Sequence, residues 1–226
     1  YPEGAVELED GSILIVGFTR EQENVARLDR DGEVIWSRSI GESRETPPNL
    51  EYLVSTSDGN LATVSNSHYS LSPAISIVKF DLEGEVIWSS NLSVGAGVYV
   101  RDLVPTQAGG VTVLTGASLV RFAGDGAVAW SVTLPSDFLG NGRLAGTADD
   151  GVALLGDNRI ARFDMDGNVV WNKAYAAELG TEPIDFRATP DGGFVVGSST
   201  YSYAASTSSA SSYFPRTAWY CQNMVL

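Results

Sequence analysis

Short turns that combine two carboxylates with a glycine are the stretches of this chain with the clearest potential for chemistry. Residues 29–32 (DRDG) and 164–167 (DMDG) have the spacing with which a calcium-binding loop begins. Such a loop needs a glutamate at its twelfth position, where these stretches have Ile40 and Tyr175. We therefore expect the aspartates to accept hydrogen bonds from turn amides, with calcium binding as the minor alternative.

Residues for nucleophilic catalysis are scarce. The chain has one histidine, His68, and one cysteine, Cys221, and neither lies in a recognisable catalytic motif. A single cysteine excludes an internal disulfide and a cysteine-based metal cluster. His68 and its neighbour Tyr69 fall in an expected loop and are candidate binding residues. No catalytic residue is predicted; enzymatic activity stays uncertain, and a binding role is favoured.

The carboxylate turns belong to a repeat that ends in tryptophan. Its copies are residues 28–36 (LDRDGEVIW), 80–88 (FDLEGEVIW), 122–130 (FAGDGAVAW) and 163–171 (FDMDGNVVW). Alternating apolar residues on both sides of a glycine turn predict a β-hairpin. The valine two residues before each tryptophan is expected on the same strand face as the indole. Each indole is expected to dock between neighbouring sheets, at Trp36, Trp88, Trp130 and Trp171.

A second turn precedes each of these hairpins. It spans residues 9–13, 57–61, 107–111, 148–152 and 190–194. Each unit therefore has four strands, a to d, and successive tryptophans are 52, 42 and 41 residues apart. A period of roughly 40–50 residues per four-stranded unit is typical of a β-propeller blade. We predict an all-β, single-domain propeller over residues 1–226, with four-stranded antiparallel blades near 1–40, 48–92, 97–134 and 141–175 and a partial fifth at 183–226.

The hairpin resembles the tryptophan-docking repeat of PQQ-like (quinoprotein-like) propellers. The shared pattern is an aspartate before the turn, a glycine, and a tryptophan four residues later. It is matched by Asp29, Gly32 and Trp36, by Asp81, Gly84 and Trp88, and by Asp164, Gly167 and Trp171, whereas Ala123 replaces the aspartate of the third copy. The turn is one residue shorter than in that family. The resemblance implies blade architecture in a ring of about six to eight blades.

The resemblance also raises PQQ and calcium as cofactors. Quinoprotein dehydrogenases are larger, and no local motif here matches their catalytic aspartate or cofactor-binding residues. The vicinal cysteine pair of some members cannot form with one cysteine. We therefore expect no cofactor, and PQQ or calcium stays the alternative.

The fifth unit ends early. Residues 198–212 are rich in Ser, Thr, Ala and Tyr, and residues 218–222 are expected to form strand c, so that Trp219 is not a docking tryptophan. A propeller must close its ring or leave exposed strand edges. Two interpretations stay open: the chain is a piece of a longer propeller, or a neighbouring subunit completes the fifth blade and the protein self-assembles.

The starts of the a strands supply the predicted binding site. When the units are aligned on their a–b turns, polar residues fall at equivalent positions of the innermost strands, which line the channel of a propeller. We expect them to ring one channel mouth, held by salt bridges or binding a polar ligand: Glu51, Tyr52, Arg101, Asp102, Arg143 and Asp185.

Loop residues and modification sites add weaker candidates. Tyr201 and Tyr203 lie in the Ser-rich stretch and, with Tyr69, could stack on sugar rings. Asn91 begins an Asn-Leu-Ser triplet, which is a glycosylation acceptor in an exported protein.

The charge is strongly acidic. The formal net charge is −14, and only Lys79 and Lys173 are lysines among 14 basic residues. This composition favours a high-salt source over an ordinary acidic secreted protein. Phosphate would be repelled, so nucleic acid and anionic membranes are not expected partners. The chain also has no apolar run of 18 residues that would span a membrane as a helix.

These observations predict a non-catalytic, exported propeller that acts as a binding or assembly scaffold at a cell surface or in an extracellular structure, with a protein or glycan partner. A PQQ-dependent oxidoreductase and a polysaccharide-binding or polysaccharide-cleaving propeller are the alternatives.

Overall fold

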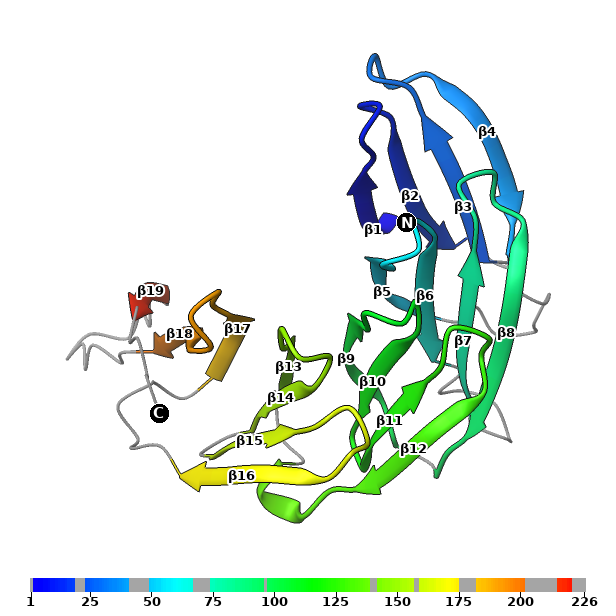
Figure 1. Ribbon diagram of the computed structural model, residues 1–226. Helices are drawn as coiled ribbons and strands as arrows, with labels where there is room; N and C mark the ends of the chain where they lie inside the picture. The colour runs from blue at the N-terminus through cyan, green and yellow to red at the C-terminus, as the bar shows by residue number, and fades with distance from the viewer. Residues whose placement is uncertain are drawn as a thin grey trace. The chain divides into compact units, whose positions relative to one another are not determined.

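The computed structural model describes residues 2–18, 23–40, 49–66, 74–95, 97–138, 142–156, 159–174, 182–201 and 215–220 (Figure 1). The chain divides into two compact units, Tyr1–Thr133 and Leu134–Leu226.

The first unit consists of three four-stranded antiparallel sheets, in each of which the strands follow chain order from one edge to the other. The first sheet comprises β1 (Pro2–Glu7), β2 (Ile13–Phe18), β3 (Glu23–Leu28) and β4 (Val34–Ser39). The second comprises β5 (Asn49–Ser55), β6 (Leu61–Asn66), β7 (Ala74–Phe80) and β8 (Val86–Ser93). The third comprises β9 (Val100–Pro105), β10 (Val111–Thr115), β11 (Ser118–Phe122) and β12 (Val128–Thr133).

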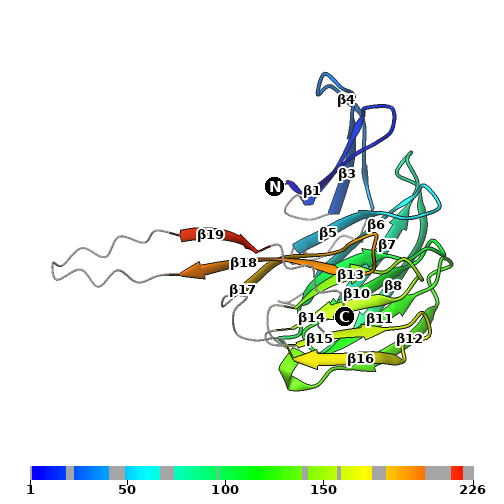
Figure 2. The ribbon, with the colours of Figure 1, turned by 60° about the vertical axis from the view of Figure 1, so that its left-hand side comes forward.

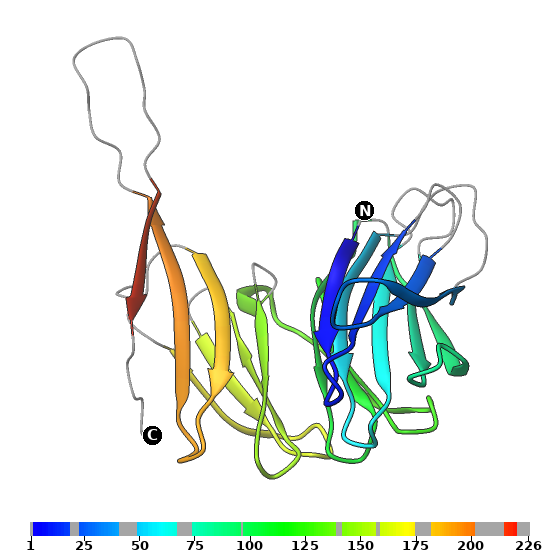
Figure 3. The ribbon, with the colours of Figure 1, turned by 90° about the horizontal axis from the view of Figure 1, so that it is seen from above.

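The second unit continues the same pattern. Its fourth sheet comprises β13 (Arg143–Gly146), β14 (Val152–Leu155), β15 (Arg159–Phe163) and β16 (Val169–Ala174). The fifth sheet has three described strands, β17 (Glu182–Ala188), β18 (Phe194–Tyr201) and β19 (Pro215–Tyr220). Figures 2 and 3 show β18 paired with β19 beside β17. The one helical segment in the described residues is a single 3-10 turn, η1 (Ser136–Phe138).

Apolar residues pack between successive sheets and hold each unit together. One cluster, which includes Leu14, Leu61 and Phe80, joins the first sheet to the second. Another joins the second to the third and includes Ile77 and Phe122. In the second unit, the equivalent cluster is formed by residues of the fourth and fifth sheets, among them Ala153 and Phe186. The two middle strands of the second sheet, β6 and β7, are buried on both faces because a neighbouring sheet covers each face, whereas burial alternates along β2 of the first sheet.

The outer hairpin of each complete sheet contains a β-bulge that simple alternation does not predict. In the first sheet, Leu28 pairs with Val34 and Arg27 pairs with Trp36, which leaves Ile35 as the extra residue. The same register shift occurs at Ile87, Ala129 and Val170. Because cross-strand partners share a face, Val34 and Trp36 point to opposite faces. The expectation that valine and tryptophan share a face was therefore wrong.

Candidate binding site at the turn end of the first unit

The a–b and c–d turns of each sheet lie at one end of it, here called the turn end. In the c–d turns, Asp29 accepts hydrogen bonds from the backbone amides of Asp31 and Glu33, both at 2.9 Å. Asp81 and Asp164 accept equivalent bonds from their own turn amides. The predicted structural role of these aspartates is confirmed. No group of three or more His, Cys, Asp or Glu residues within the described ranges is arranged to hold a metal ion.

A second aspartate, in the a–b turn, forms an ion pair with a basic residue of strand c. The pairs are Arg27–Asp10 at 2.7 Å, Lys79–Asp58 at 2.5 Å and Arg162–Asp149 at 2.5 Å. Each basic residue also lies directly across from the repeat tryptophan in the strand register. Sequence analysis missed this arrangement, although a basic residue followed by Leu or Phe recurs in every copy, at Arg27, Lys79, Arg121 and Arg162.

The electrostatics of the pairs differ with the depth of the basic residue. Burial raises the pKa of Asp58, but hydrogen bonds from Lys79 and Thr56 outweigh it and lower the pKa to about 2. The Lys79 side chain is only 2% exposed. At Asp10, hydrogen bonds from Ser12 lower the pKa, with a smaller contribution from Arg27, whose side chain is 17% exposed. The ion pair of the second sheet is therefore the more deeply placed of the two.

The junction between the second and third sheets, here called the second junction, is closed at its turn end by hydrogen bonds. Lys79 Nζ donates to the carbonyl oxygen of Gly109 at 2.7 Å as well as to Asp58. Ser57 Oγ donates to the carbonyl of Gln107 at 2.8 Å and accepts from the amide of Gly109 at 3.0 Å. A Cβ on Gly109 would lie 2.8 Å from Asp58 Oδ2, so the two turns are in direct contact.

Trp88 completes this junction. Its Nε1 donates to the carbonyl of Gly124 at 2.8 Å, and its ring stacks on Phe122 with centroids 6.3 Å apart. A Cβ on Gly126 would lie 2.7 Å from the indole, and the glycine has a φ of 86°. Glycine at this position therefore serves both the turn conformation and the approach of the tryptophan.

The junction between the first and second sheets, the first junction, uses the same positions differently. Trp36 lies against Gly84, where a Cβ would approach the ring to 2.7 Å, and Arg38 forms an ion pair with Glu85. Arg27 Nη1 donates to the carbonyl of Leu82 at 3.4 Å. Leu82 is the counterpart of Gly124 in the repeat. The carbonyl that accepts from Arg27 at the first junction therefore corresponds to the one that accepts from the Trp88 indole at the second junction.

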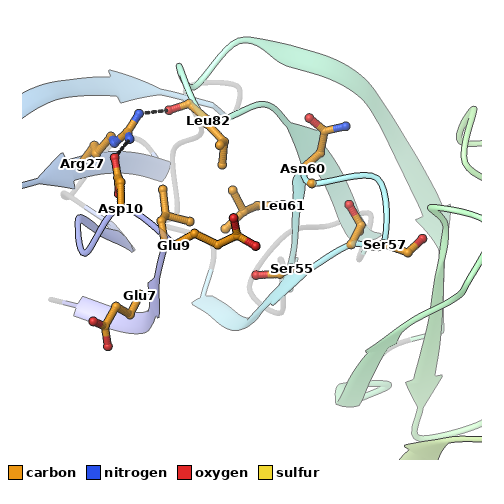
Figure 4. A pocket seen from close by; sticks show the side chains of 12 residues that line it. Glu7, Glu9, Asp10, Arg27, Ser55, Ser57, Asn60, Leu61 and Leu82 are labelled. Carbon is orange, nitrogen blue, oxygen red and sulfur yellow. Dashed lines mark hydrogen bonds and ion pairs between the residues drawn. The ribbon is translucent and has the colours of Figure 1, made fainter.

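A pocket of about 590 Å³ lies at the turn end of the first junction (Figure 4). Glu9 holds the repeat position of Ser57 and extends between the two sheets. A Cβ on Gly59 would meet nothing within 4 Å, whereas its counterpart Gly109 is in contact with Asp58. The pocket is lined by Glu7, Leu8, Glu9, Asp10, Arg27, Ser55, Thr56, Ser57, Gly59, Asn60, Leu61 and Leu82. The sequence did not predict this pocket. Its residues come from two neighbouring sheets, and no single motif brings them together.

The outermost strands expose apolar side chains beside the c–d turns. The bulge turns two consecutive residues away from the packed cores, and both are at least 45% exposed in three of the four repeats. The exposed residues are Val34 and Ile35 on β4, Val86 and Ile87 on β8, Val128 on β12, and Val169 and Val170 on β16.

The predicted channel-mouth residues lie at equivalent register positions. Glu51, Arg101 and Ile184 are the bulge residues of β5, β9 and β17, each followed by a paired residue. The Tyr52 hydroxyl donates to the carbonyl of Arg101 at 2.5 Å, and so joins β5 to β9.

The charged members of that set make local contacts. Asp102 accepts a hydrogen bond from the amide of Leu103, and Asp185 pairs with Arg187 of its own strand at 3.0 Å. Arg143 donates to the carbonyl of Gly142. Arg101 and Asp102 belong to the first unit, and Arg143 and Asp185 to the second. A ring of these side chains around one mouth stays a prediction.

Four of the remaining candidate residues have no described side chain. His68, Tyr69 and Tyr203 lie outside the described residues, as does the side chain of Tyr201. Asn91 is exposed on β8.

Among the tryptophans of the later repeats, Trp171 packs edge-on against Phe194 of the fifth sheet, with centroids 6.1 Å apart. Trp130 is half-buried on β12. Within the described part of the chain, no helix is long and apolar enough to cross a membrane.

Comparison with solved structures defines the class of fold. The chain is similar to virginiamycin B lyase from Staphylococcus aureus, with a TM-score of 0.65 and 13% identity over 96% of this chain and 69% of the lyase. It is also similar to the Pan2 WD40 domain of Neurospora crassa, with a TM-score of 0.60 and 11% identity over 94% of this chain and 60% of that one. A gluconolactonase from Xanthomonas campestris gives a TM-score of 0.52 and 12% identity over 86% and 68%. The predicted β-propeller fold is confirmed, and the chain spans 60–69% of the length of these proteins.

The sequence places the chain more narrowly within that class. A family model described as outer membrane protein assembly factor BamB matches residues 73–189, just over half of the chain. The chain belongs to this family of PQQ-like repeat propellers, which confirms the predicted resemblance. No curated protein matches the chain significantly in sequence.

Proposed function

We propose that this chain is a non-catalytic scaffold that binds polypeptides during the assembly of exported proteins, at the cell envelope or surface. The observation that carries the proposal is that valine or isoleucine side chains are exposed on the last strand of each complete sheet, β4, β8, β12 and β16. Each of these strands has only one neighbour within its own sheet. Such an edge offers unpaired backbone groups together with apolar side chains, which is what an extended polypeptide needs for strand addition.

The family supports the assembly role, because the family model that matches this chain is described as an outer membrane protein assembly factor. The net charge of −14 supports a protein partner over nucleic acid or an anionic membrane surface. The bulges at Ile35 and Ile87 act in the same direction. They increase the twist of the edge and disfavour uncontrolled pairing between copies of the chain, while they leave side chains available for a transient partner.

Site-specific photo-cross-linking tests the proposal. A photo-reactive amino acid replaces Ile87 on β8, and the matched control replaces Glu83, an exposed residue of the adjoining c–d turn. In cells of the source organism, the proposal predicts cross-links from position 87 to exported polypeptides and few from position 83. Equal yields from the two positions, or cross-links from position 87 mainly to cytosolic proteins, would contradict it.

The PQQ-dependent and polysaccharide-directed alternatives, and the expected lack of a cofactor, stay predictions. Mixing the chain with PQQ and calcium and recording cofactor absorbance and dye reduction distinguishes the oxidoreductase alternative. Binding to a glycan array distinguishes the other.

A further inference from the structure

We propose that the pocket at the first junction binds the ammonium group of a lysine side chain presented by a polypeptide partner. The proposal rests on the scaffold function above. It names the chemistry of a second contact with the polypeptide partner, at the pocket and not on the outermost strands.

The second junction supplies the internal precedent. There, a lysine ammonium, that of Lys79, lies under the a–b turns and bonds to Asp58 Oδ2 at 2.5 Å and to the carbonyl of Gly109 at 2.7 Å. The Lys79 side chain is buried and lies two residues from Ile77, which belongs with Phe122 to the apolar cluster between the second and third sheets. The repeat thus forms a site for one ammonium, with a carboxylate on one turn and a glycine carbonyl on the next.

At the first junction, the same acceptor is present without a donor. Gly59 corresponds to Gly109, and no described residue donates a hydrogen bond to its carbonyl. The carboxylate of Glu9 extends from the facing turn in the place that the short Ser57 side chain takes at the second junction (Figure 4). Leu8 and Leu82 line the pocket, are only half-buried, and offer apolar surface along which the methylene groups of a lysine can pack.

Arg27 does not fill the site from within. Its guanidinium donates to Ser12 Oγ at 3.0 Å, to Asp10 Oδ2 at 2.7 Å and to the carbonyl of Leu82. These three bonds hold it at the wall formed by its own sheet and the c–d turn of the second sheet. Asp10 balances the charge of Arg27, so Glu7 and Glu9 leave the lining with an excess of negative charge. A compact ammonium suits one carboxylate and one carbonyl, whereas a guanidinium is matched best by a planar, bidentate acceptor.

A peptide titration followed by NMR of the full chain tests the assignment. The probe is acetyl-Ala-Lys-Ala-amide, and the matched control peptide has norleucine in place of lysine. We expect lysine-dependent shifts at the amides of Glu9, Gly59 and Leu82. Glu9→Gln is expected to weaken binding about fivefold or more, since it removes the facing charge. Glu33→Gln removes one charge from a turn outside the pocket and is expected to change binding by less than about twofold.

A second variant tests the precedent itself. Arg27→Lys gives the first sheet the basic residue of the second, and its ammonium is expected to reach the carbonyl of Gly59 as Lys79 reaches that of Gly109. This variant is expected to lose peptide binding while its circular dichroism stays that of the parent.

Four results would overturn the proposal: equal shifts with the norleucine peptide, equal affinity in the Glu9→Gln and Glu33→Gln variants, full peptide binding by the Arg27→Lys variant, or tighter binding of an arginine peptide. Failure here is separable from failure of the scaffold function. Cross-linking from position 87 does not depend on Glu9, and peptide binding does not depend on the β8 side chains.

Discussion

The first and second junctions are built from the same repeat, yet one contains a pocket and the other is closed. At the second junction, Ser57 and Lys79 join two a–b turns through three hydrogen bonds across the sheets. At the first, Glu9 and Arg27 hold those two positions, and the cross-sheet bond of Arg27 runs to the c–d turn. Differences at a few repeat positions, Glu9 against Ser57 and Arg27 against Lys79 among them, thus separate a candidate site from a structural contact within the same architecture.

The largest difference between the junctions is expected from their tryptophans. Trp88→Ala removes an indole that packs on Phe122 and donates to Gly124, and it should lower the free energy of unfolding by about 3–5 kcal/mol. Trp36→Ala should have a smaller effect, because no hydrogen bond from its Nε1 to another described residue accompanies its packing on Gly84. Denaturant unfolding of both variants measures the difference, and a Trp36→Ala effect equal to or larger than that of Trp88→Ala would contradict the comparison.

The ion pairs provide the next test. Asp58→Asn leaves the buried ammonium of Lys79 with a carbonyl partner only and is expected to destabilise the chain by about 2 kcal/mol. This is below the usual 3–5 kcal/mol for breaking a buried pair, because Asp58 is itself 42% exposed and screened by solvent. Asp10→Asn should destabilise less, since Arg27 keeps Ser12 and Leu82 as partners. Thermal unfolding of the two variants would contradict this order if Asp10→Asn had the lower midpoint.

Glycine substitutions compare the space at the two junctions. Gly59 and Gly109 both have positive φ, 80° and 74°, so alanine should strain either turn by about 1–2 kcal/mol. Only Gly109→Ala would also bring a methyl group to 2.8 Å from Asp58 Oδ2. Gly109→Ala is therefore expected to destabilise more than Gly59→Ala, as measured by denaturant midpoints. Equal midpoints would mean that the turn of Gly109 has as much space as that of Gly59.

Acid should affect the second junction through Asp58. Its pKa is about 2 in the folded chain against an ordinary 3.8, so the ionised carboxylate stabilises the folded state. That contribution is complete above a pH of about 4 and is lost as the pH falls toward about 2. The stability difference between the parent and Asp58→Asn should therefore shrink over that interval. A difference that stays constant down to a pH of about 2 would show that the pair does not lower this pKa.

The parts of the fold that depend on local sequence were predictable. The glycine turns, the strand alternation and the recurring tryptophan indicate four-stranded repeats without tertiary information. The observed β6, β10 and β14 each begin at the last residue of a predicted a–b turn. The bulge at Ile35 was not predictable from alternation, because one extra residue reverses which face the preceding valine takes.

The candidate site depended on relations that single motifs do not carry. Asp58 and Lys79 are 21 residues apart and meet only across the sheet. The pocket follows from the difference between Glu9 and Ser57, which matters only once the turns of neighbouring sheets are known to face each other. An alignment of the repeats would have singled out the first junction if two positions had been compared together. These are the basic residue of strand c, Arg27 or Lys79, and the first residue of the a–b turn, Glu9 or Ser57.

Amide hydrogen exchange at Gly59 and Gly109, measured by NMR on the full chain with and without the lysine peptide, tests the comparison most directly. Both amides donate to a threonine carbonyl within their own turn, that of Gly59 to Thr56 at 3.1 Å and that of Gly109 to Thr106 at 3.3 Å, and the amide of Gly109 also donates across the junction to Ser57 Oγ at 3.0 Å. We predict that Gly59 exchanges faster than Gly109, and that the peptide slows Gly59 alone. Equal exchange at the two glycines without peptide, or slowing of both by it, would contradict an open first junction beside a closed second one.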